Sequence, residues 1–463
     1  MNISVVEALE KVLAPNQILV NEAVSERSHH IWRMDTPLQA VAVVLPKNTE
    51  DVAEILKICH LHNQAVVVHG GMTNMVGSTE TQGEELVISM EKMNRIEELD
   101  ESSRTMTVQA GAILQDIQEV AGEKGLLFPL NFGAKGSAQI GGVISTNAGG
   151  MRVVKYGMTR HLILGVEAVL ADGTVINSLK KIIKDNSGFD LKQLFIGSEG
   201  TLGIVTKAVL KLLEAPSSRN SAFVALDTYE QAIAFLKYMD AGLAGHLSCF
   251  ELIWNNTFQA MTSPPALVKP PLPYDYPYYV LLESLGNQQD ADRQRLEELL
   301  VGAQENGMIV DAAMAFTESD INWFFKIRED VDVLVNRCRN DQHFDISLPI
   351  ASIGKTVNEI LEELAVLTGV EQVFAFGHVA DGNIHLIVGK TEETPELIKA
   401  VNQVVYAPLQ ALGGSVSAEH GIGVHKKPYL ELSRTPAEIQ LMQLLKKSMD
   451  PKGILNRGKV IDV

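Results

Sequence analysis

Residues 38 to 215 alternate short β-branched runs with segments of helical period, and several of the strand-like runs end in glycine. The run AVAVVLP precedes TEDVAEILKICHLHNQ, whose apolar residues recur at helical spacing behind Thr49 as the predicted N-cap. AVVVHGG then has the pattern of a strand that enters a glycine loop, which predicts a β–α–β unit. LVIS, TMTVQAG and GVEAVLADGTVI follow as strands, the last closing on a hairpin turn at Asp172 and Gly173. The pattern predicts an α+β domain whose glycine loops let the backbone approach a large ligand.

A polar break with one proline, EAPSSRN, separates this domain from a second one. FVALD, CFELI, VLLESLG, IVDAAMA and FDISLPI then alternate with helical segments, so we predict an antiparallel sheet with helices on one face. A last helix is predicted at residues 435–449, and Pro451 and Gly453 end it and turn the tail back. The predicted domains are therefore 1–215 and 216–418, with a C-terminal segment, 419–463, that returns to the first domain.

Composition limits the classes of function. The 463 residues suffice for two domains, and the net charge of −18 argues against nucleic acid as a partner. Cys59, Cys249 and Cys338 are scattered without a CxxC motif, which excludes an iron–sulfur cluster and suits a reducing compartment. No apolar stretch is long enough to span a membrane. Because the N-terminus has neither a transit-peptide nor a signal-sequence pattern, we expect a cytoplasmic protein, with peripheral membrane association as the alternative.

Three glycine-rich stretches lie in the first domain: VVVHGGMTNMVGS at residues 66–78, PLNFGAKGSAQIGGVISTNAGG at 129–150, and LFIGSEGTLGIVT at 194–206. Successive backbone N–H groups in such loops form a nest that binds anions. In the second stretch Ser137 is the predicted cap of a helix that begins near Gly141 and Gly142 and adds a positive helix end. The dinucleotide and Walker patterns are absent. Two such loops in one domain predict a pyrophosphate site, whereas the third alone is also typical of a tight turn.

A cluster of candidate metal ligands lies in the second domain and just beyond it, in FGHVADGNIHL at residues 376–386 and SAEHGIG at 417–423. Asn383 and His385 are two apart on a predicted strand and share a face, and an Asp–Gly turn lets His378 approach them. With Glu419 the two histidines form a plausible ligand set for a divalent metal that keeps open positions. Zinc is the first candidate, with manganese or iron as alternatives. His420 is the predicted general base, and the competing interpretation is that the histidines are hydrogen-bonded core residues.

These motifs, together with VVKYGMTRHLILGVEAVLADGT and DPKGILN, resemble those of the FAD-binding dehydrogenases of the vanillyl-alcohol-oxidase/PCMH superfamily. Within it the sequence is similar to the D-2-hydroxyglutarate dehydrogenase and D-lactate dehydrogenase branch, with the motifs in the family's order from about residue 38 to the C-terminus. The resemblance implies an α+β, two-domain PCMH-type fold with an antiparallel-sheet substrate domain and a C-terminal helical tail. It also implies non-covalent FAD, because relatives that attach flavin use a His inside the first loop, where this chain has Thr73 and where His69 precedes the glycines.

The resemblance assigns FAD contacts to all three glycine stretches and to the tail. The first loop would hold the pyrophosphate, the second the isoalloxazine and ribityl groups, and the third the adenine half. The implied cofactor-binding residues are His69, Gly70, Gly71, Met72, Thr73, Asn74, Met75, Gly77, Ser78, Pro129, Gly136, Ser137, Ile140, Gly141, Gly142, Asn147, Gly149, Gly150, Glu199, Gly203, Ile204 and Asn456.

The implied reaction oxidises a D-2-hydroxy acid to the 2-oxo acid. The metal would bind the carboxylate and hydroxyl, Asn383 would contact the substrate, and His420 would take the hydroxyl proton as the C2 hydride passes to flavin N5. The branch's Arg–Thr–Lys substrate cluster aligns with Arg328, Asp332 and His343. Because Asp332 would repel a second carboxylate, this departure from the branch's cluster argues against D-2-hydroxyglutarate and leaves the identity of the hydroxy acid open. For Arg328 the alternative is a helix-surface ion pair.

The expected partners are a small anionic hydroxy acid and an electron acceptor such as an electron-transfer flavoprotein or a quinone, with a homodimer as a candidate assembly. Three other functions stay open at this point. The chain could be the flavin-bearing subunit of a larger, glycolate-type electron-transfer complex, or a non-catalytic FAD- or metal-binding protein. A flavin-dependent transferase of the ether-lipid branch is the third, but its histidine-rich run is not found, since His29 and His30 lie outside the relevant region.

Overall fold

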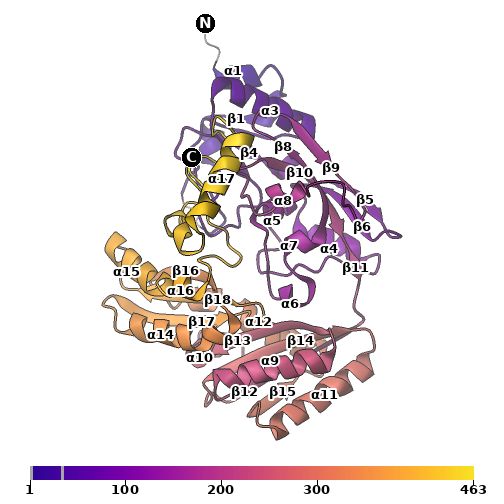
Figure 1. Cartoon of the computed structure of the whole chain (residues 1–463), viewed down its shortest axis with the longest axis vertical. Coiled ribbons are helices and arrows are strands. Elements are labelled where there is room, and N and C mark those ends of the chain that lie inside the picture. Colours follow the sequence, from indigo (N-terminus) through magenta and orange to yellow (C-terminus); the bar gives the residue numbers. More distant parts are fainter. Residues whose placement is uncertain (1–3, 33–35) are drawn as a thin grey trace. The chain divides into compact units, whose positions relative to one another are not determined.

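The computed structural model describes residues 4–32 and 36–463. The described chain divides into two compact units, shown in Figure 1. Unit 1 consists of Met1–Gly149, Gly157–Ala215 and Glu419–Val463, and unit 2 of Gly150–Tyr156 and Pro216–Ala418. The sequence assigned residues 150–156 to the first domain, whereas in the structure they pack within unit 2.

The core of unit 1 lies on two sheets. One has the strand order β1-β2-β4-β3, in which β2, β4 and β3 run parallel as a β–α–β unit requires. The other has the order β5-β6-β10-β8-β9 and is antiparallel, and its β8–β9 hairpin closes at Gly173 with φ of 86°. The strands of unit 1 are β1 (Ile18–Leu19), β2 (Ala42–Val44), β3 (Val66–His69), β4 (Leu86–Ser89), β5 (Ile96–Asp100), β6 (Thr105–Gln109), β7 (Leu126–Leu127), β8 (Ile163–Val169), β9 (Val175–Ser178), β10 (Ile204–Lys211) and β11 (Leu213–Glu214).

The helices of unit 1 follow the predicted segments, but two caps differ. Asn48, not Thr49, caps α3, because its side chain accepts from the Asp51 N–H at 2.8 Å while the Thr49 hydroxyl bonds to Glu167. Ser137 does not cap α5, which begins after Gln139 without a side-chain cap. The helices are α1 (Val5–Leu9), α2 (Glu22–Ser25), α3 (Thr49–His62), α4 (Leu114–Gly122), α5 (Ile140–Thr146), α7 (Thr159–Leu162), α8 (Lys192–Phe195) and α17 (Pro436–Met449), with 3₁₀ turns at Pro15–Gln17, Met90–Lys92 and Lys427–Leu432.

Unit 2 is built on an antiparallel sheet of order β15-β12-β14-β13-β17-β18-β16. Its strands are β12 (Ser218–Leu226), β13 (Leu247–Trp254), β14 (Tyr278–Gly286), β15 (Asp311–Met314), β16 (Asn340–Ser347), β17 (Val370–Gly377) and β18 (Asn383–Lys390). Its helices are α6 (Val153–Tyr156), α9 (Tyr229–Leu243), α10 (Asn255–Thr262), α11 (Gln289–Glu305), α12 (Glu318–Glu329), α13 (Asp332–Val335), α14 (Ile353–Ala365), α15 (Pro395–Tyr406) and α16 (Leu409–Leu412), with a 3₁₀ turn at Ile350–Ser352.

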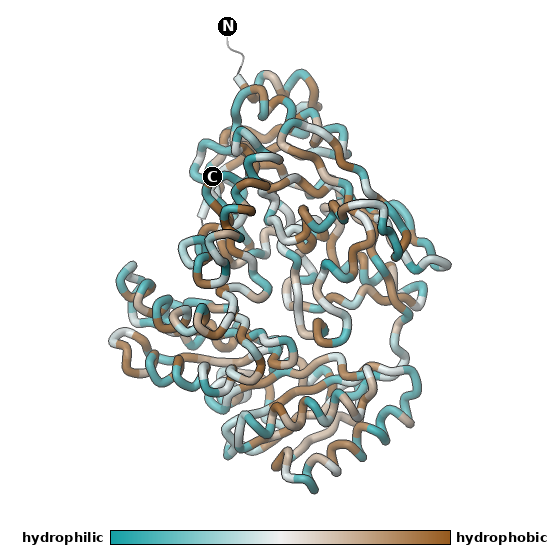
Figure 2. The backbone as a smooth tube through the Cα atoms, in the orientation of Figure 1, coloured by the Kyte–Doolittle hydropathy of each residue, from teal (hydrophilic) through white to brown (hydrophobic). Residues whose placement is uncertain are grey.

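Helices cover both faces of this sheet, so the prediction of helices on one face was wrong. Phe250 of β13 packs on Phe235 of α9, with ring centroids 5.8 Å apart, and on the opposite face Phe223 of β12 packs on Phe324 of α12 at 5.4 Å. Every residue of β13 is buried, which a strand covered on one face would not show. Figure 2 shows the resulting pattern, with hydrophobic colour along the strands and alternating colour along α9. Among the described residues, no helix is long and apolar enough to cross a membrane.

Candidate functional site

The first two glycine stretches of unit 1 pack against each other through their backbones. A Cβ on Gly71 would lie 2.1 Å from the Ser137 carbonyl oxygen, so only glycine fits there. Gln139 lies beside this contact, 3.7 Å from where a Cβ on Gly70 would be. Its Oε1 is buried, and no donor among the described residues reaches it. Gln139 was not predicted from the sequence, and its unpaired acceptor lies beside Gly70 of the first glycine loop.

Side chains hold the first loop from within. Asn74 Oδ1 accepts from the Ser78 N–H at 2.9 Å, and its Nδ2 donates to Thr79 Oγ1 at 2.7 Å. His69 is 2% exposed and its Nε2 donates to the Thr79 carbonyl oxygen at 2.9 Å. Burial lowers the pKa of His69 to about 3, so the ring is neutral. Asn74 and His69 therefore shape the loop, and the Ser78 N–H is already occupied.

Glu199 joins the third glycine stretch to the first loop and to the C-terminal segment. Its carboxylate accepts from Ser78 Oγ at 2.7 Å and from the backbone N–H groups of Ile422 and Gly423 at 2.6 and 2.9 Å. Burial nevertheless raises the pKa of Glu199. Asn456 adds a second connection, because its Nδ2 donates to the Glu199 carbonyl at 2.6 Å and its Oδ1 accepts from the Val68 N–H at 3.1 Å. These two residues hold the tail on the glycine loops of unit 1.

The other predicted cofactor residues occupy several places in the loops. Asn147 ends α5 in a left-handed conformation with φ of 51°. A Cβ on Gly149 would lie 2.5 Å from Glu419 Oε1, so the Glu419 carboxylate lies against this loop within unit 1. In the first loop, Met72 and Gly77 have positive φ, the Thr73 carbonyl accepts from Trp32 Nε1, and Met75 is partly exposed. In the second stretch, Pro129 and Gly136 precede α5, whose first turn is formed by Ile140, Gly141 and Gly142, and Gly150 begins the unit 2 segment. In the third stretch, Gly203 and Ile204 lead into β10.

In unit 2 the structure brings His378 and His385 together. Strands β17 and β18 are antiparallel, with Phe376 opposite His385. The turn between them is closed by the Asp381 N–H, which donates to the His378 carbonyl at 3.1 Å, and Gly382 adopts φ of 89°. The Nε2 atoms of the two imidazoles consequently lie 3.4 Å apart.

A buried carboxylate lies behind each imidazole. Glu251 of β13 hydrogen-bonds to His378 Nδ1 and accepts from Arg328 Nε at 2.7 Å. Burial would raise the pKa of Glu251, but His378 and Arg328 outweigh it and bring the value to about 2. On the other ring, His385 Nδ1 lies 3.9 Å from Asp345 Oδ1. Metal-binding histidines usually have such a carboxylate at the nitrogen that does not bind the ion. Neither acid was predicted from the sequence, although an acid within an otherwise apolar run such as CFELI is a usable signal.

Asn383 presents an unpaired acceptor next to this pair. Its Nδ2 donates to Asp345 Oδ1 at 2.7 Å and to the Ile346 carbonyl at 3.2 Å. Because both neighbours accept, the amide orientation is determined and Oδ1 points elsewhere. Asn383 is 3% exposed, and among the described residues no donor reaches its Oδ1. This oxygen can accept a hydrogen bond from a hydroxyl group.

The three residues predicted to select the substrate have different surroundings. Arg328 of α12 is 6% exposed, so it is not a surface residue, and its guanidinium lies 4.4 Å from the centre of the Phe376 ring. Asp332 begins α13 and is exposed. His343 of β16 pairs with Asp341 at 2.7 Å.

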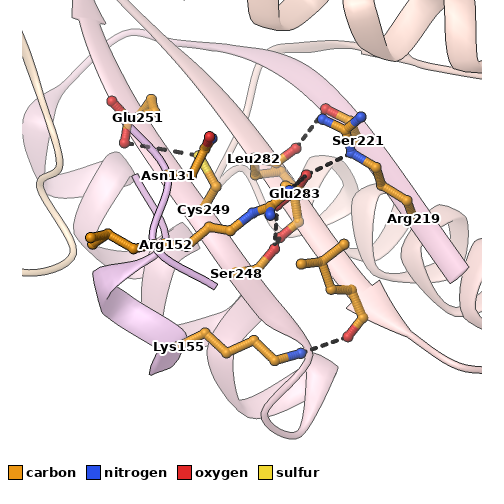
Figure 3. Close-up of polar contacts among 12 residues, drawn as sticks. Asn131, Arg152, Lys155, Arg219, Ser221, Ser248, Cys249, Glu251, Leu282 and Glu283 are labelled. Atoms are coloured by element: carbon orange, nitrogen blue, oxygen red, sulfur yellow. Dashed lines mark hydrogen bonds and ion pairs between the residues drawn. The ribbon is translucent and has the colours of Figure 1, made fainter. Parts of the chain in front are cut away.

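Figure 3 shows a third buried carboxylate of unit 2, Glu283 on β14. Arg152 Nε and Nη2 both donate to it at 3.0 Å, Arg219 Nε at 2.7 Å and Ser248 Oγ at 2.8 Å. Lys155 donates to the Leu285 carbonyl at 2.6 Å. Since Arg152 and Lys155 belong to residues 150–156, these bonds hold that short segment in unit 2.

The remaining predicted catalytic residues stand where the chain passes from one unit to the other. Ala418 ends unit 2, and its N–H donates to Asp345 Oδ2 at 3.1 Å. Glu419 and His420 follow directly and open the last segment of unit 1.

Comparison with known proteins places most of the chain in one family. Residues 40–178 match the FAD binding domain, and residues 215–460 match the C-terminal domain of FAD linked oxidases. The chain is 36% identical over 456 residues to the mitochondrial D-2-hydroxyglutarate dehydrogenase of Arabidopsis thaliana, covering 98% of this chain and 81% of the relative. It is 32% identical over 459 residues to the D-2-hydroxyglutarate–pyruvate transhydrogenase of Saccharomyces cerevisiae, covering 97% and 92%.

Solved structures agree on the fold. An alkyldihydroxyacetonephosphate synthase superposes with a TM-score of 0.76 at 16% identity, covering 98% of this chain and 84% of the other. p-Cresol methylhydroxylase superposes with a TM-score of 0.75 at 14% identity, covering 99% and 96%. The predicted PCMH-type two-domain fold is thereby confirmed.

One expectation is contradicted. The relatives from Arabidopsis thaliana and Bos taurus, both 36% identical to this chain, are named as mitochondrial proteins. The prediction of a cytoplasmic location conflicts with these names and is corrected on that ground. The matched domains, the full-length relatives and the fold agree that this chain belongs to the FAD linked oxidases, as an FAD-binding oxidoreductase.

Proposed function

We propose that this chain oxidises a D-2-hydroxy acid to the 2-oxo acid, with non-covalent FAD on the glycine loops of unit 1 and a divalent metal on His378 and His385. The observation that carries the proposal is the histidine pair, with its Nε2 atoms 3.4 Å apart and carboxylates behind both rings. The names of the D-2-hydroxyglutarate dehydrogenase relatives support the substrate class.

The spacing of the histidines suits a metal ion. Zinc binds imidazole nitrogen at about 2.0–2.1 Å with tetrahedral angles, which separates two such nitrogens by about 3.3–3.4 Å. With Nδ1 of His378 donating to Glu251, its Nε2 carries a lone pair that points toward the other ring. In the structure the two Nε2 atoms share a hydrogen bond, and a bound cation would take the place of the shared hydrogen. Zinc is the ion we propose, with manganese or iron as alternatives that metal analysis distinguishes.

Glu419 is the proposed third ligand. It directly follows Ala418, whose N–H is bonded to the same Asp345 that faces His385. In unit 1 its carboxylate lies against Gly149 at the end of the second glycine stretch.

The FAD site is supported by its own loops. Gly71 packs on Ser137 without room for a side chain, and Gln139 offers a buried acceptor with no donor among the described residues. An acceptor in this position suits a flavin N–H or a ribityl hydroxyl. The inward-bonded His69 supports non-covalent attachment, since its ring is buried and bonded to Thr79.

His378, His385 and Glu419 would hold a divalent metal, which would supply a Lewis acid for the substrate's oxygens, and FAD on the loops of unit 1 would supply the acceptor for the C2 hydride. The chain's own residues handle the proton. Asn383 Oδ1 accepts the hydrogen bond of the substrate hydroxyl and so orients it, and His420 then takes that proton as the 2-oxo group forms. One hydride and one proton leave the substrate, which balances a two-electron oxidation.

Arg328 is the proposed anchor for the substrate carboxylate. Its Nε is used by Glu251, which leaves the Nη groups to bind a carboxylate. His343 is paired with Asp341, and Asp332 adds a negative charge. We therefore propose a substrate with one carboxylate in preference to D-2-hydroxyglutarate.

Anaerobic flavin bleaching tests this proposal. The purified FAD-loaded chain is mixed with D- and L-2-hydroxy acids that carry one or two carboxylates, and flavin reduction is followed by absorbance. D-acids with one carboxylate should bleach the flavin fastest. Reduction by L-acids alone would refute the stereochemistry, and faster reduction by D-2-hydroxyglutarate would refute the argument from Asp332 and His343.

Metal analysis tests the histidine pair separately. His385→Ala should lose the bound metal and turnover, whereas His62→Ala, at an exposed histidine of α3, should keep both. Full metal content and turnover in His385→Ala would remove the metal site from the proposal.

The alternative function is a flavin-bearing subunit of a larger electron-transfer complex. Electrons must leave the reduced flavin, and we propose an electron-transfer flavoprotein or a quinone as the acceptor. Steady turnover of the isolated chain with an artificial dye acceptor would contradict the subunit alternative. Size-exclusion chromatography with light scattering decides whether the chain forms the homodimer that we also propose.

A further inference from the structure

We propose that Glu251 is a positioning residue that holds the metal ligand His378 and the substrate anchor Arg328 with one carboxylate. This inference rests on the proposed function, since it assigns a role to a residue behind the proposed metal. Glu251 is not among the residues predicted from the sequence.

Three elements of unit 2 converge on this carboxylate. Strand β13 carries Glu251 and pairs with β17 at Leu252 and Gly377, so His378 follows directly beside it. Helix α12 carries Arg328 to the other carboxylate oxygen at 2.7 Å. Phe376 of β17 supports the guanidinium from its flat side, with the ring centre 4.4 Å from Arg328 Cζ. The Glu251 side chain is 0% exposed, so these bonds are shielded from bulk solvent.

A carboxylate is the group that this position requires. All of its partners donate. His378 donates through Nδ1 to Oε1, Arg328 through Nε to Oε2, and the Cys249 thiol adds a weak bond to Oε1 at 3.9 Å, so an ionised carboxylate suits them because it accepts on both oxygens. The bond to Nδ1 sets the His378 tautomer in which Nε2 has the lone pair needed for a metal. The bond to Nε turns the guanidinium so that its Nη groups remain for an anion. Glu251 thus links metal binding to substrate binding.

Glu283 provides a matched control in the same sheet. It lies on the neighbouring strand β14, is 0% exposed and binds two arginines, Arg152 and Arg219, but no histidine. Figure 3 shows it close to Glu251, with Cys249 between the two acids. A variant of Glu283 therefore reproduces the loss of a buried charge beside arginine without touching the proposed metal ligand.

The test replaces Glu251 by glutamine. The amide has one acceptor and one donor, so it must direct its NH₂ at either His378 Nδ1 or Arg328 Nε. Facing His378, it favours the tautomer with hydrogen on Nε2, which cannot bind a metal. Facing Arg328, it displaces the guanidinium. We expect Glu251→Gln to weaken zinc binding about 10–100-fold, as for other residues behind a metal ligand, and to raise KM for the hydroxy acid at least about tenfold at saturating zinc.

The measurements are made on the full FAD-loaded chain by zinc competition against a coloured chelator and by steady-state kinetics. Glu283→Gln should leave the zinc affinity and KM within about twofold of the wild type, and Arg328→Gln should raise KM while leaving zinc affinity unchanged. Only the Glu251 variant should change both quantities. FAD content and circular dichroism check that each variant is folded.

The outcomes separate the two proposals. A folded Glu251→Gln that binds zinc like the wild type overturns the inference, and so does one that loses zinc affinity with KM unchanged at saturating zinc. A wild-type chain that binds no divalent metal overturns the proposed function itself. If the variant does not fold, the positioning role is tested instead by the His378 tautomer in the zinc-free wild type, measured from its ¹⁵N chemical shifts. The inference predicts that the hydrogen is on Nδ1. A hydrogen on Nε2 would refute the positioning role.

Discussion

His69 makes the stability of unit 1 depend on pH in a way that can be calculated. Its pKa is about 3 in the folded chain, lowered by burial from the ordinary value of 6.5. As the pH falls below 6.5, the unfolded chain therefore binds a proton that the folded chain does not. The contribution of His69 to folding stability is fully present above the pKa that its ring has in the unfolded chain. It is lost as the pH falls toward the pKa of His69 in the folded chain.

The size of this effect follows from the two pKa values. Between about pH 8 and about pH 5, protonation of His69 in the unfolded chain costs about 2 kcal/mol of folding stability. His69→Gln removes the titrating ring, while its amide can still donate to the Thr79 carbonyl. The difference in unfolding free energy between variant and wild type should therefore shift by about 2 kcal/mol in favour of the variant over this range.

Urea denaturation of the FAD-free chain at both pH values measures this shift. Hydrogen exchange of peptides from β3 and β4 assigns the transition to unit 1. His62→Gln, at an exposed histidine of α3, is the control and should show no comparable shift. Other groups titrate in the same range, but their contributions cancel in the comparison with the wild type. Equal losses of stability in the wild type and in His69→Gln would refute the reasoning.

Two further substitutions test the loops and the short segment of unit 2. Gly71→Ala places a Cβ 2.1 Å from the Ser137 carbonyl oxygen, so it should displace the second loop and weaken FAD binding at least tenfold. Flavin fluorescence measures this affinity. The control is Gly122→Ala, whose Cβ would have nothing within 4 Å and which should bind FAD normally. An FAD affinity within twofold of the wild type in Gly71→Ala would contradict the close packing of the loops. Arg152→Gln removes two bonds to the fully buried Glu283 and should destabilise unit 2 by about 3 kcal/mol in urea titrations. A loss below about 1 kcal/mol would mean that Arg219 compensates the charge alone.

Local patterns were sufficient for the elements and for part of the site. The strand and helix periods of residues 38–215 predicted β3, β4, β6 and the β8–β9 hairpin, because side-chain alternation within a run reflects which face is buried. The two-residue spacing of Asn383 and His385, with a turn before them, was enough to predict that His378 would come close. These inferences concern residues within about ten positions of each other.

Helix caps and the covered faces of the sheet were harder to predict, because they depend on which of several possible partners a residue or a sheet face contacts. Asn48 and Thr49 are both good N-cap residues, and Thr49 was displaced by its bond to Glu167, which lies 118 residues away. Whether helices cover one or both faces of the unit 2 sheet depends on which helices pack against it. The run CFELI is compatible with a strand covered on one face or on both.

The sequence by itself determined the family, the two domains and the histidines that could bind a metal, because these are recorded in short motifs and local periods. Only the tertiary structure decided which acids stand behind the histidines and that Arg328 is buried. Glu251 lies 127 residues from His378 and 77 from Arg328, so no spacing or motif joins them. What joins them is the order β13-β17-β18 in the sheet and the packing of α12 against it. Burial strengthens the contacts of Glu251 with His378 and Arg328, because a carboxylate removed from water must be paired with hydrogen-bond donors of the protein.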